Sequence, residues 1–114
     1  MSKLKLLVAL TFGLFIADKK YTSVTLREAD VGDMIDAESD VGPGTIVAFS
    51  TAMMARQIVE VSGPDGTYSG PITLDMLRKL KPKDYRKLRD AQEQLEQLGN
   101  DEQNASAASL TESS

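Results

Sequence analysis

A run of strand-forming residues passes directly into an acidic segment with helical spacing, between Val24 and Glu38, and this junction constrains the fold most. Tyr21–Leu26 is rich in aromatic and β-branched residues, which predicts a strand. Asp30 can serve as the N-cap of a helix, with Asp33 completing an imperfect capping box. The first apolar residues after this cap recur at helical spacing and are expected to face a core, namely Val31, Met34 and Ile35.

The strand needs a partner, and the segment before it offers one. Residues 6–17 form an apolar run, and Asp18–Lys20 is a polar break, so we expect a β-hairpin with a bulge or bend at Gly13. A basic start followed by an apolar run also has the outline of a signal peptide at 1–17, which would make the chain a small exported or membrane-associated protein. Small residues before a cleavage site are not in place for it, and the run is shorter than the roughly 20 residues of a membrane span.

The part of the chain after the breaker cluster Val41–Gly44 is predicted to be helical. Ile46–Val61, with Thr45 as N-cap, has apolar residues over a wide arc and is expected to be the central helix of the core, with Phe49 buried in it. Met53 and Met54 allow a second interpretation as an adaptable binding surface, because methionine side chains repack around varied partners.

Turn residues fill 62–71, and two more helices follow. Thr73 caps a short helix, Pro82 begins the last one, and Gly99 is a natural stop. The apolar seam of that last helix consists of Tyr85, Leu88, Ala91, Leu95 and Leu98. Residues 100–114 are small and polar and are expected to be disordered. The predicted fold is α+β: one small domain at 1–99, with a hairpin at 4–28 and three or four helices at 30–99, then a tail.

Composition limits what the domain can do. The 114 residues carry a net charge of −4 and include neither histidine nor cysteine. The commonest general base, the commonest metal ligand and the thiolate nucleophile are therefore missing, which argues against an enzyme and against a bound metal or cofactor. The acidity also argues against a general nucleic-acid binder.

Two clusters of charge remain. The six carboxylates within Glu28–Asp40 lack the alternating ligand spacing of a calcium loop and are interpreted as a solvated helix face. A basic strip contains Arg78, Lys79, Lys81, Lys83, Arg86, Lys87 and Arg89. It can be a solvated face, a docking strip for an acidic partner or a nucleic-acid surface, and the charge balance favours the first two.

Two motifs resemble a known family. The segment TLREADVGDMIDAE, from Thr25 to Glu38, is similar to the entry segment of the tail assembly chaperones of Mu-like and P2-like contractile-tailed phages. The segment ITLDMLRKLKPKDYRKL, from Ile72 to Leu88, is similar to the family's closing pattern. The residues that carry the resemblance are Thr25, Leu26, Arg27, Glu28, Gly32, Asp33, Asp84 and Tyr85.

This resemblance implies a function. Members of the family bind the tape measure protein and keep it competent for assembly until the tail tube forms around it. They act in the host cytoplasm, are absent from the mature virion, and commonly occur with a longer, frameshifted form. We expect no membrane and no nucleic acid as partners, and we keep homo-oligomerisation open. The residues predicted to bind the partner are Met53, Met54, Lys83, Arg86, Lys87 and Arg89.

Overall fold

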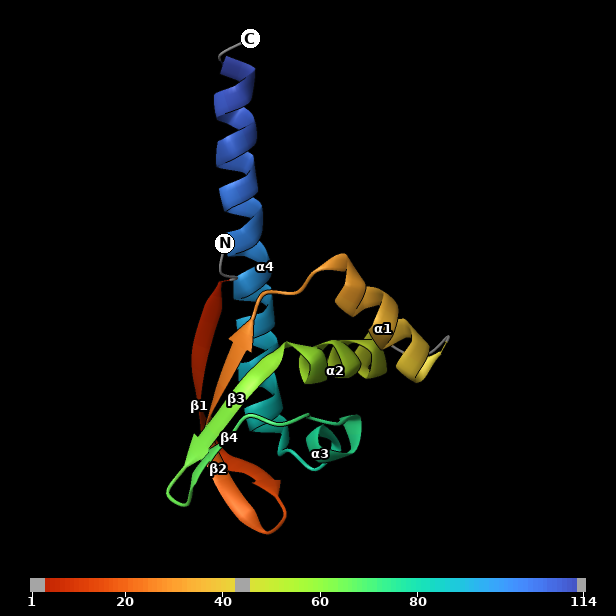
Figure 1. Cartoon of the computed structure of the whole chain (residues 1–114), viewed down its shortest axis with the longest axis vertical. Helices are drawn as coiled ribbons and strands as arrows, with labels where there is room; N and C mark the ends of the chain where they lie inside the picture. The colour runs from red at the N-terminus through yellow and green to blue at the C-terminus, as the bar shows by residue number, and fades with distance from the viewer. Residues whose placement is uncertain (1–3, 43–45, 113–114) are drawn as a thin grey trace.

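The computed structural model describes residues 4–42 and 46–112 and has an α+β architecture (Figure 1). The elements follow in the order β1 Lys5–Ile16, β2 Lys19–Arg27, α1 Val31–Val41, α2 Ile46–Gln57, β3 Ile58–Gly63, β4 Gly66–Tyr68, α3 Leu74–Arg78 and α4 Pro82–Glu112. The expected α+β class, the N-terminal hairpin and the helices after it are confirmed. The N-cap predicted at Thr45 lies outside the described residues.

The four strands form one antiparallel sheet in the order β1-β2-β3-β4. The turn of the first hairpin is Ala17–Asp18, and both residues have positive φ, 51° and 67°. Two successive residues of this kind match the right-handed twist of the flanking strands. The turn therefore comes earlier than the predicted loop, and Lys19 and Lys20 belong to β2.

A bulge interrupts β1, as predicted around Gly13. Ala9 pairs with Ser23, but Leu14 already pairs with Tyr21, so residues 10–13 of β1 lie opposite residue 22 alone. Gly13 has φ of 93°, a conformation that side chains disfavour. The bulge turns successive backbone N–H groups away from β2 and toward α4.

The core lies between one face of the sheet and α4, which runs across it (Figure 1). Leu88, Ala91 and Leu95 of the predicted seam are buried, whereas Leu98 is 46% exposed. The largest fully buried apolar side chains are Leu14, Val24, Leu26, Met54, Val61, Leu88 and Leu95. They come from β1, β2, β3, α2 and α4, so α4 together with the sheet organises the core.

Three sequence-based predictions about the helices are wrong. The helix predicted for Ile46–Val61 ends at Gln57, because the β-branched residues after it pair with β2 as strand β3. Phe49 is only partly buried, so α2 is not the centre of the core. Gly99 does not end the last helix, which continues to Glu112 and extends away from the rest of the molecule (Figure 1).

The apolar residues of α1 are also placed differently from the prediction. Val31, Met34 and Ile35 are 68%, 47% and 60% exposed. Helix α1 packs mainly against α2, and the face it buries contains Asp33 and Ala37. An apolar stripe at helical spacing is therefore left at the surface.

Candidate functional site

Arg27 and Asp33 join the end of β2 to the start of α1. The guanidinium donates hydrogen bonds of 2.7 and 2.8 Å to the two carboxylate oxygens and a third, of 2.9 Å, to the carbonyl of Arg56. The pKa of Arg27 is raised, because the hydrogen bond to Asp33 favours the charged guanidinium more than burial disfavours it. Asp30 caps α1 in a full capping box with Asp33, as predicted. The start of α1 is thus fixed to β2 and to the end of α2.

Asp84 joins α4 to the bulge in β1. Its carboxylate accepts hydrogen bonds from the backbone N–H groups of Thr11, Phe12 and Gly13, at 2.7, 2.8 and 3.0 Å. The residue is fully buried. Burial raises the pKa of Asp84. The three backbone donors and the nearby Lys87 ammonium together lower it by more, so the pKa lies below its usual value. Three N–H groups converging on one anion form a nest of the kind that binds carboxylates and phosphates.

The other motif residues also hold the domain together. Leu26 is in the core, and Thr25 lies half-buried beside it on β2. The Glu28 carboxylate accepts a hydrogen bond of 3.2 Å from the backbone N–H of Leu4. A Cβ at Gly99 would lie 3.1 Å from the same carboxylate, so a glycine there lets α4 approach β2 closely. Gly32 lies exposed in the first turn of α1.

Tyr85 and its neighbours complete the scaffold. The Tyr85 hydroxyl lies 3.0 Å from the hydroxyl of Thr51 in α2, within hydrogen-bond distance. Lys87 donates hydrogen bonds to the Thr11 hydroxyl and to the carbonyl of Ala9, at 2.6 and 3.4 Å. The motif that carries the family resemblance therefore consists mostly of residues that connect elements, and the surface that binds a partner must be sought elsewhere.

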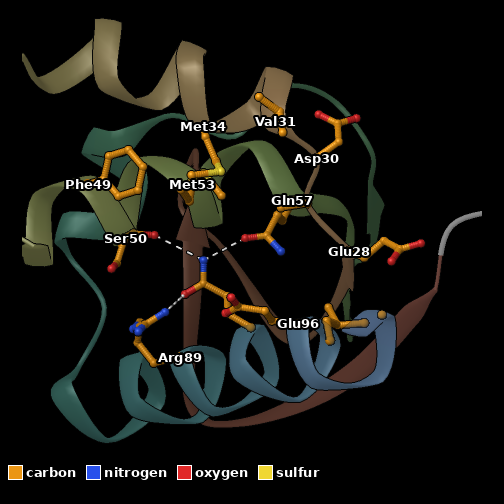
Figure 2. A pocket seen from close by; sticks show the side chains of 14 residues that line it. Glu28, Asp30, Val31, Met34, Phe49, Ser50, Met53, Gln57, Arg89 and Glu96 are labelled. Atoms are coloured by element: carbon orange, nitrogen blue, oxygen red, sulfur yellow. Dashed lines mark hydrogen bonds between the residues drawn. The ribbon is translucent and has the colours of Figure 1, made fainter. Parts of the chain in front are cut away.

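A groove of about 650 Å³ lies between α1, α2 and α4 (Figure 2). We call it the α1/α2/α4 groove. One side is apolar, because Met34, Phe49 and Met53 point into it from α1 and α2. The opposite side is polar and comes largely from α4. The full lining consists of Glu28, Ala29, Asp30, Val31, Met34, Phe49, Ser50, Met53, Gln57, Arg89, Gln92, Leu95, Glu96 and Gly99.

A hydrogen-bond network fixes the floor of this groove. The Gln92 amide donates to the side-chain oxygen of Gln57 and to the carbonyl of Ser50, at 2.8 and 3.2 Å, and its oxygen accepts from Arg89 at 2.6 Å (Figure 2). Gln57 in turn donates to the carbonyl of Arg27 at 3.0 Å. Gln57 and Gln92 are buried with their polar atoms paired, which gives the groove a rigid floor. This network was not predicted from the sequence, although a glutamine beside Leu88 and Leu95 in the seam was a signal for it.

The structure separates the residues predicted to bind a partner. Met53 lines the α1/α2/α4 groove, but Met54 is fully buried in the core and has no surface to offer. Lys83 and Arg86 are exposed on α4, whereas Lys87 is bound to β1. Arg89 lines the groove and, two residues after Lys87, lies on a different side of α4 from it. The basic strip is therefore not one surface.

Comparisons with known proteins agree with the resemblance. Residues 10–108 match the family described as tail assembly protein gp41. The chain is 35% identical over 120 aligned positions to the probable tail assembly protein gp41 of Escherichia phage Mu, with 96% of this chain and 76% of that protein covered. It is equally similar to the probable tail assembly protein FS-gp41 of the same phage, of which it covers 58%. No solved structure gives a significant match. Within the described residues, none of the helices is long and apolar enough to cross a membrane.

Proposed function

The chain belongs to the gp41 family of phage tail assembly proteins, and from this premise we propose that it is a chaperone for the tape measure protein. It would bind this protein in the host cytoplasm and keep it competent for assembly until the tail tube forms around it. The role needs binding and no catalysis. The chaperone would then leave, so that it is absent from the finished virion.

The observation that carries the proposal is the α1/α2/α4 groove, which is open and apolar on one side. A long helical protein exposes apolar stripes before assembly, and an amphipathic helix binds by laying such a stripe into a groove. Met34 and Met53 supply adaptable contacts, which suit a target with many similar but unequal segments. The lining includes three carboxylates, from Glu28, Asp30 and Glu96, against the one guanidinium of Arg89. This charge favours a partner helix with basic residues beside its apolar stripe.

Co-expression with the tape measure protein of the same phage tests the proposal. Wild type should keep the tape measure protein in the soluble fraction and co-purify with it. Met34→Glu should weaken this, because Met34 is 47% exposed at the groove and a carboxylate there would meet an apolar stripe. Leu7→Glu is the matched control, since Leu7 is 71% exposed and lies in β1, outside the groove. An insoluble tape measure protein in the presence of wild type would overturn the proposal. Equal capture by both variants would show that the α1/α2/α4 groove is not the binding site.

The longer relative, FS-gp41, suggests that this protein also has a longer form. Each relative aligns with this chain over 120 residues, which is 76% of gp41 and 58% of FS-gp41, so FS-gp41 is the longer protein. We propose that a longer, frameshifted form of this chain is made as well and binds the same partner. Mass spectrometry of infected-cell lysate and of purified virions tests this together with the localisation. Peptides of both forms should occur in the lysate and be absent from virions, and their presence in virions would contradict the proposed role.

A further inference from the structure

A second groove, of about 550 Å³, lies where α3 and the start of α4 pack against α2. We call it the α2/α3 groove. Its lining is largely apolar and consists of Val47, Ala48, Thr51, Leu74, Leu77, Arg78, Leu80, Pro82 and Tyr85. Ile46 and Val47, at the start of α2, are 82% and 63% exposed. An apolar surface of this kind on a small domain indicates a partner.

The rim of the α2/α3 groove is basic. Arg78 lines it, and Lys79 and Lys81 follow on the exposed turn between α3 and α4. Asp75 lies 3.7 Å from Arg78, but both side chains are largely exposed, so this pair neutralises little of the positive charge. The groove therefore fits an apolar helix that carries acidic side chains.

Helix α1 of the same chain has this chemistry. It contains four carboxylates and no basic residue. Ile35 is 60% exposed, and Glu38 lies one turn further on the same face. Asp36 and Asp40 both approach the single guanidinium of Arg56, at 3.6 and 2.9 Å, so α1 keeps a negative charge. Neither Ile35 nor Glu38 lines the α1/α2/α4 groove, so this face remains available when that groove is occupied.

The acidic helix cannot fill the basic groove of its own molecule. Helix α2 lies between α1 and α3 (Figure 1), and α1 makes its contacts mainly with α2. We propose that the chain associates with itself head to tail, with the Ile35–Glu38 face of α1 from one copy docked in the α2/α3 groove of the next. The two surfaces differ, so the contact is heterologous and repeats copy after copy, giving a ring or an open row. The inference concerns this chain alone and holds whether or not the tape measure protein is its partner.

Charge reversal at each surface gives a complementary test. In one variant, Asp36→Lys and Glu38→Lys make α1 basic; in the other, Arg78→Glu and Lys81→Glu make the groove acidic. Sedimentation equilibrium of the full chain at low salt should show the mean mass of wild type rising with concentration and falling again at about 0.5 M salt, where exposed charges are screened. Each variant alone should stay monomeric, since like charges meet. An equimolar mixture should associate again, because the acidic groove of one variant receives the basic α1 of the other.

Two controls match the changes in net charge. Glu60→Lys with Asp65→Lys changes the charge as much as the α1 reversal does, and Lys19→Glu with Lys20→Glu matches the groove reversal; all four residues are exposed and lie outside both surfaces. Both controls should associate like wild type, and circular dichroism should show that every variant is folded. Three results would each overturn the proposal. They are a wild type that stays monomeric at all concentrations, a single-surface variant that associates on its own, and a mixture of the two variants that stays monomeric. Loss of tape measure binding in the groove variant, with a monomeric wild type, would assign the α2/α3 groove to that partner instead.

Discussion

Replacing Asp84 with asparagine tests how the last helix is attached to the sheet. The buried carboxylate accepts three backbone hydrogen bonds from the bulge in β1, with Thr11 bonded to one oxygen and both Phe12 and Gly13 to the other. Asparagine has nearly the same shape but only one acceptor oxygen. Oriented to keep the two bonds to Phe12 and Gly13, it turns its NH₂ group toward the N–H of Thr11.

The cost follows from these contacts. The Thr11 N–H, whose hydrogen bond to Asp84 is partly buried, loses its acceptor, and a donor left unsatisfied away from water costs about 1–3 kcal/mol. The two remaining hydrogen bonds change from charged to neutral acceptors, and each becomes weaker by about 1 kcal/mol. We therefore expect Asp84→Asn to lower the free energy of unfolding by about 3–5 kcal/mol. This is a large part of the roughly 5–15 kcal/mol that stabilises a small domain.

Urea unfolding at pH 7, followed by circular dichroism, measures this difference. Asp90→Asn is the matched control, because Asp90 is exposed on the same helix and its loss should change stability by no more than about 0.5 kcal/mol. A loss below about 1 kcal/mol for Asp84→Asn would refute the reasoning, because it would show that the three backbone N–H groups of the bulge do not need a charged acceptor.

The pH dependence supplies a second test of the same contact. The pKa of Asp84 is depressed in the folded protein, so its contribution is fully present above the unfolded pKa of about 3.9 and is lost as pH falls through the folded pKa. The difference in stability between wild type and Asp84→Asn should therefore be constant near neutral pH and shrink below about pH 4. A difference that stays unchanged down to pH 2 would contradict a carboxylate that is charged in the folded state.

Three further changes probe other parts of the scaffold. Arg27→Lys should destabilise by about 1–2 kcal/mol in urea unfolding, because a lysine cannot reproduce the paired hydrogen bonds of the guanidinium; no change would show that the ion pair is dispensable. Gly63→Ala should cost about 1–3 kcal/mol, since the new Cβ would lie 2.3 Å from the carbonyl oxygen of Lys20; an unaffected melting temperature would show that the strands separate easily there. Deleting residues 105–114 should leave the melting temperature unchanged, as expected from the small and polar residues of this segment, and a clear drop would contradict this.

The hairpin and the helix caps could be predicted because their signals are local. A polar break between two strand-forming runs, the cap at Asp30 and the proline at the start of α4 each act within a few residues. The bulge at Gly13 was predictable for the same reason. What β1 does at the bulge was not, because the Asp84 carboxylate that binds it is more than 70 residues away in the chain.

The wrong predictions about the helices have one cause: the helical spacing of apolar residues does not show which element, if any, packs against them. Ile58, Val59 and Val61 continue the apolar pattern of α2, but β-branched residues followed by Pro-Asp-Gly and Thr-Tyr also fit a second hairpin, and pairing with β2 decides between them. Met34 and Ile35 in α1 have the spacing of a core stripe, yet both are exposed, and the buried residues of this helix are Asp33 and Ala37. Apolar spacing predicts that a face will be covered, not whether its own chain covers it.

The same limit applies to the candidate site. Met53 was predicted as a contact and lines the α1/α2/α4 groove, whereas its neighbour Met54 faces the core. The floor made by Gln57 and Gln92 brings together α2 and α4, which only the fold could reveal. The family motif identified the class of protein through residues of the scaffold, and therefore could not indicate the binding surface.

Hydrogen exchange on the complex with the tape measure protein tests the central claim most directly. The groove account predicts slower amide exchange on binding in α1, in α2 and in the part of α4 around Gln92, with little change in β4 and in the hairpin turn at Ala17–Asp18. Exchange that is unchanged in α1 and α2 while the two proteins remain bound would contradict the groove as the binding site. Failure to form any complex would contradict the chaperone role itself.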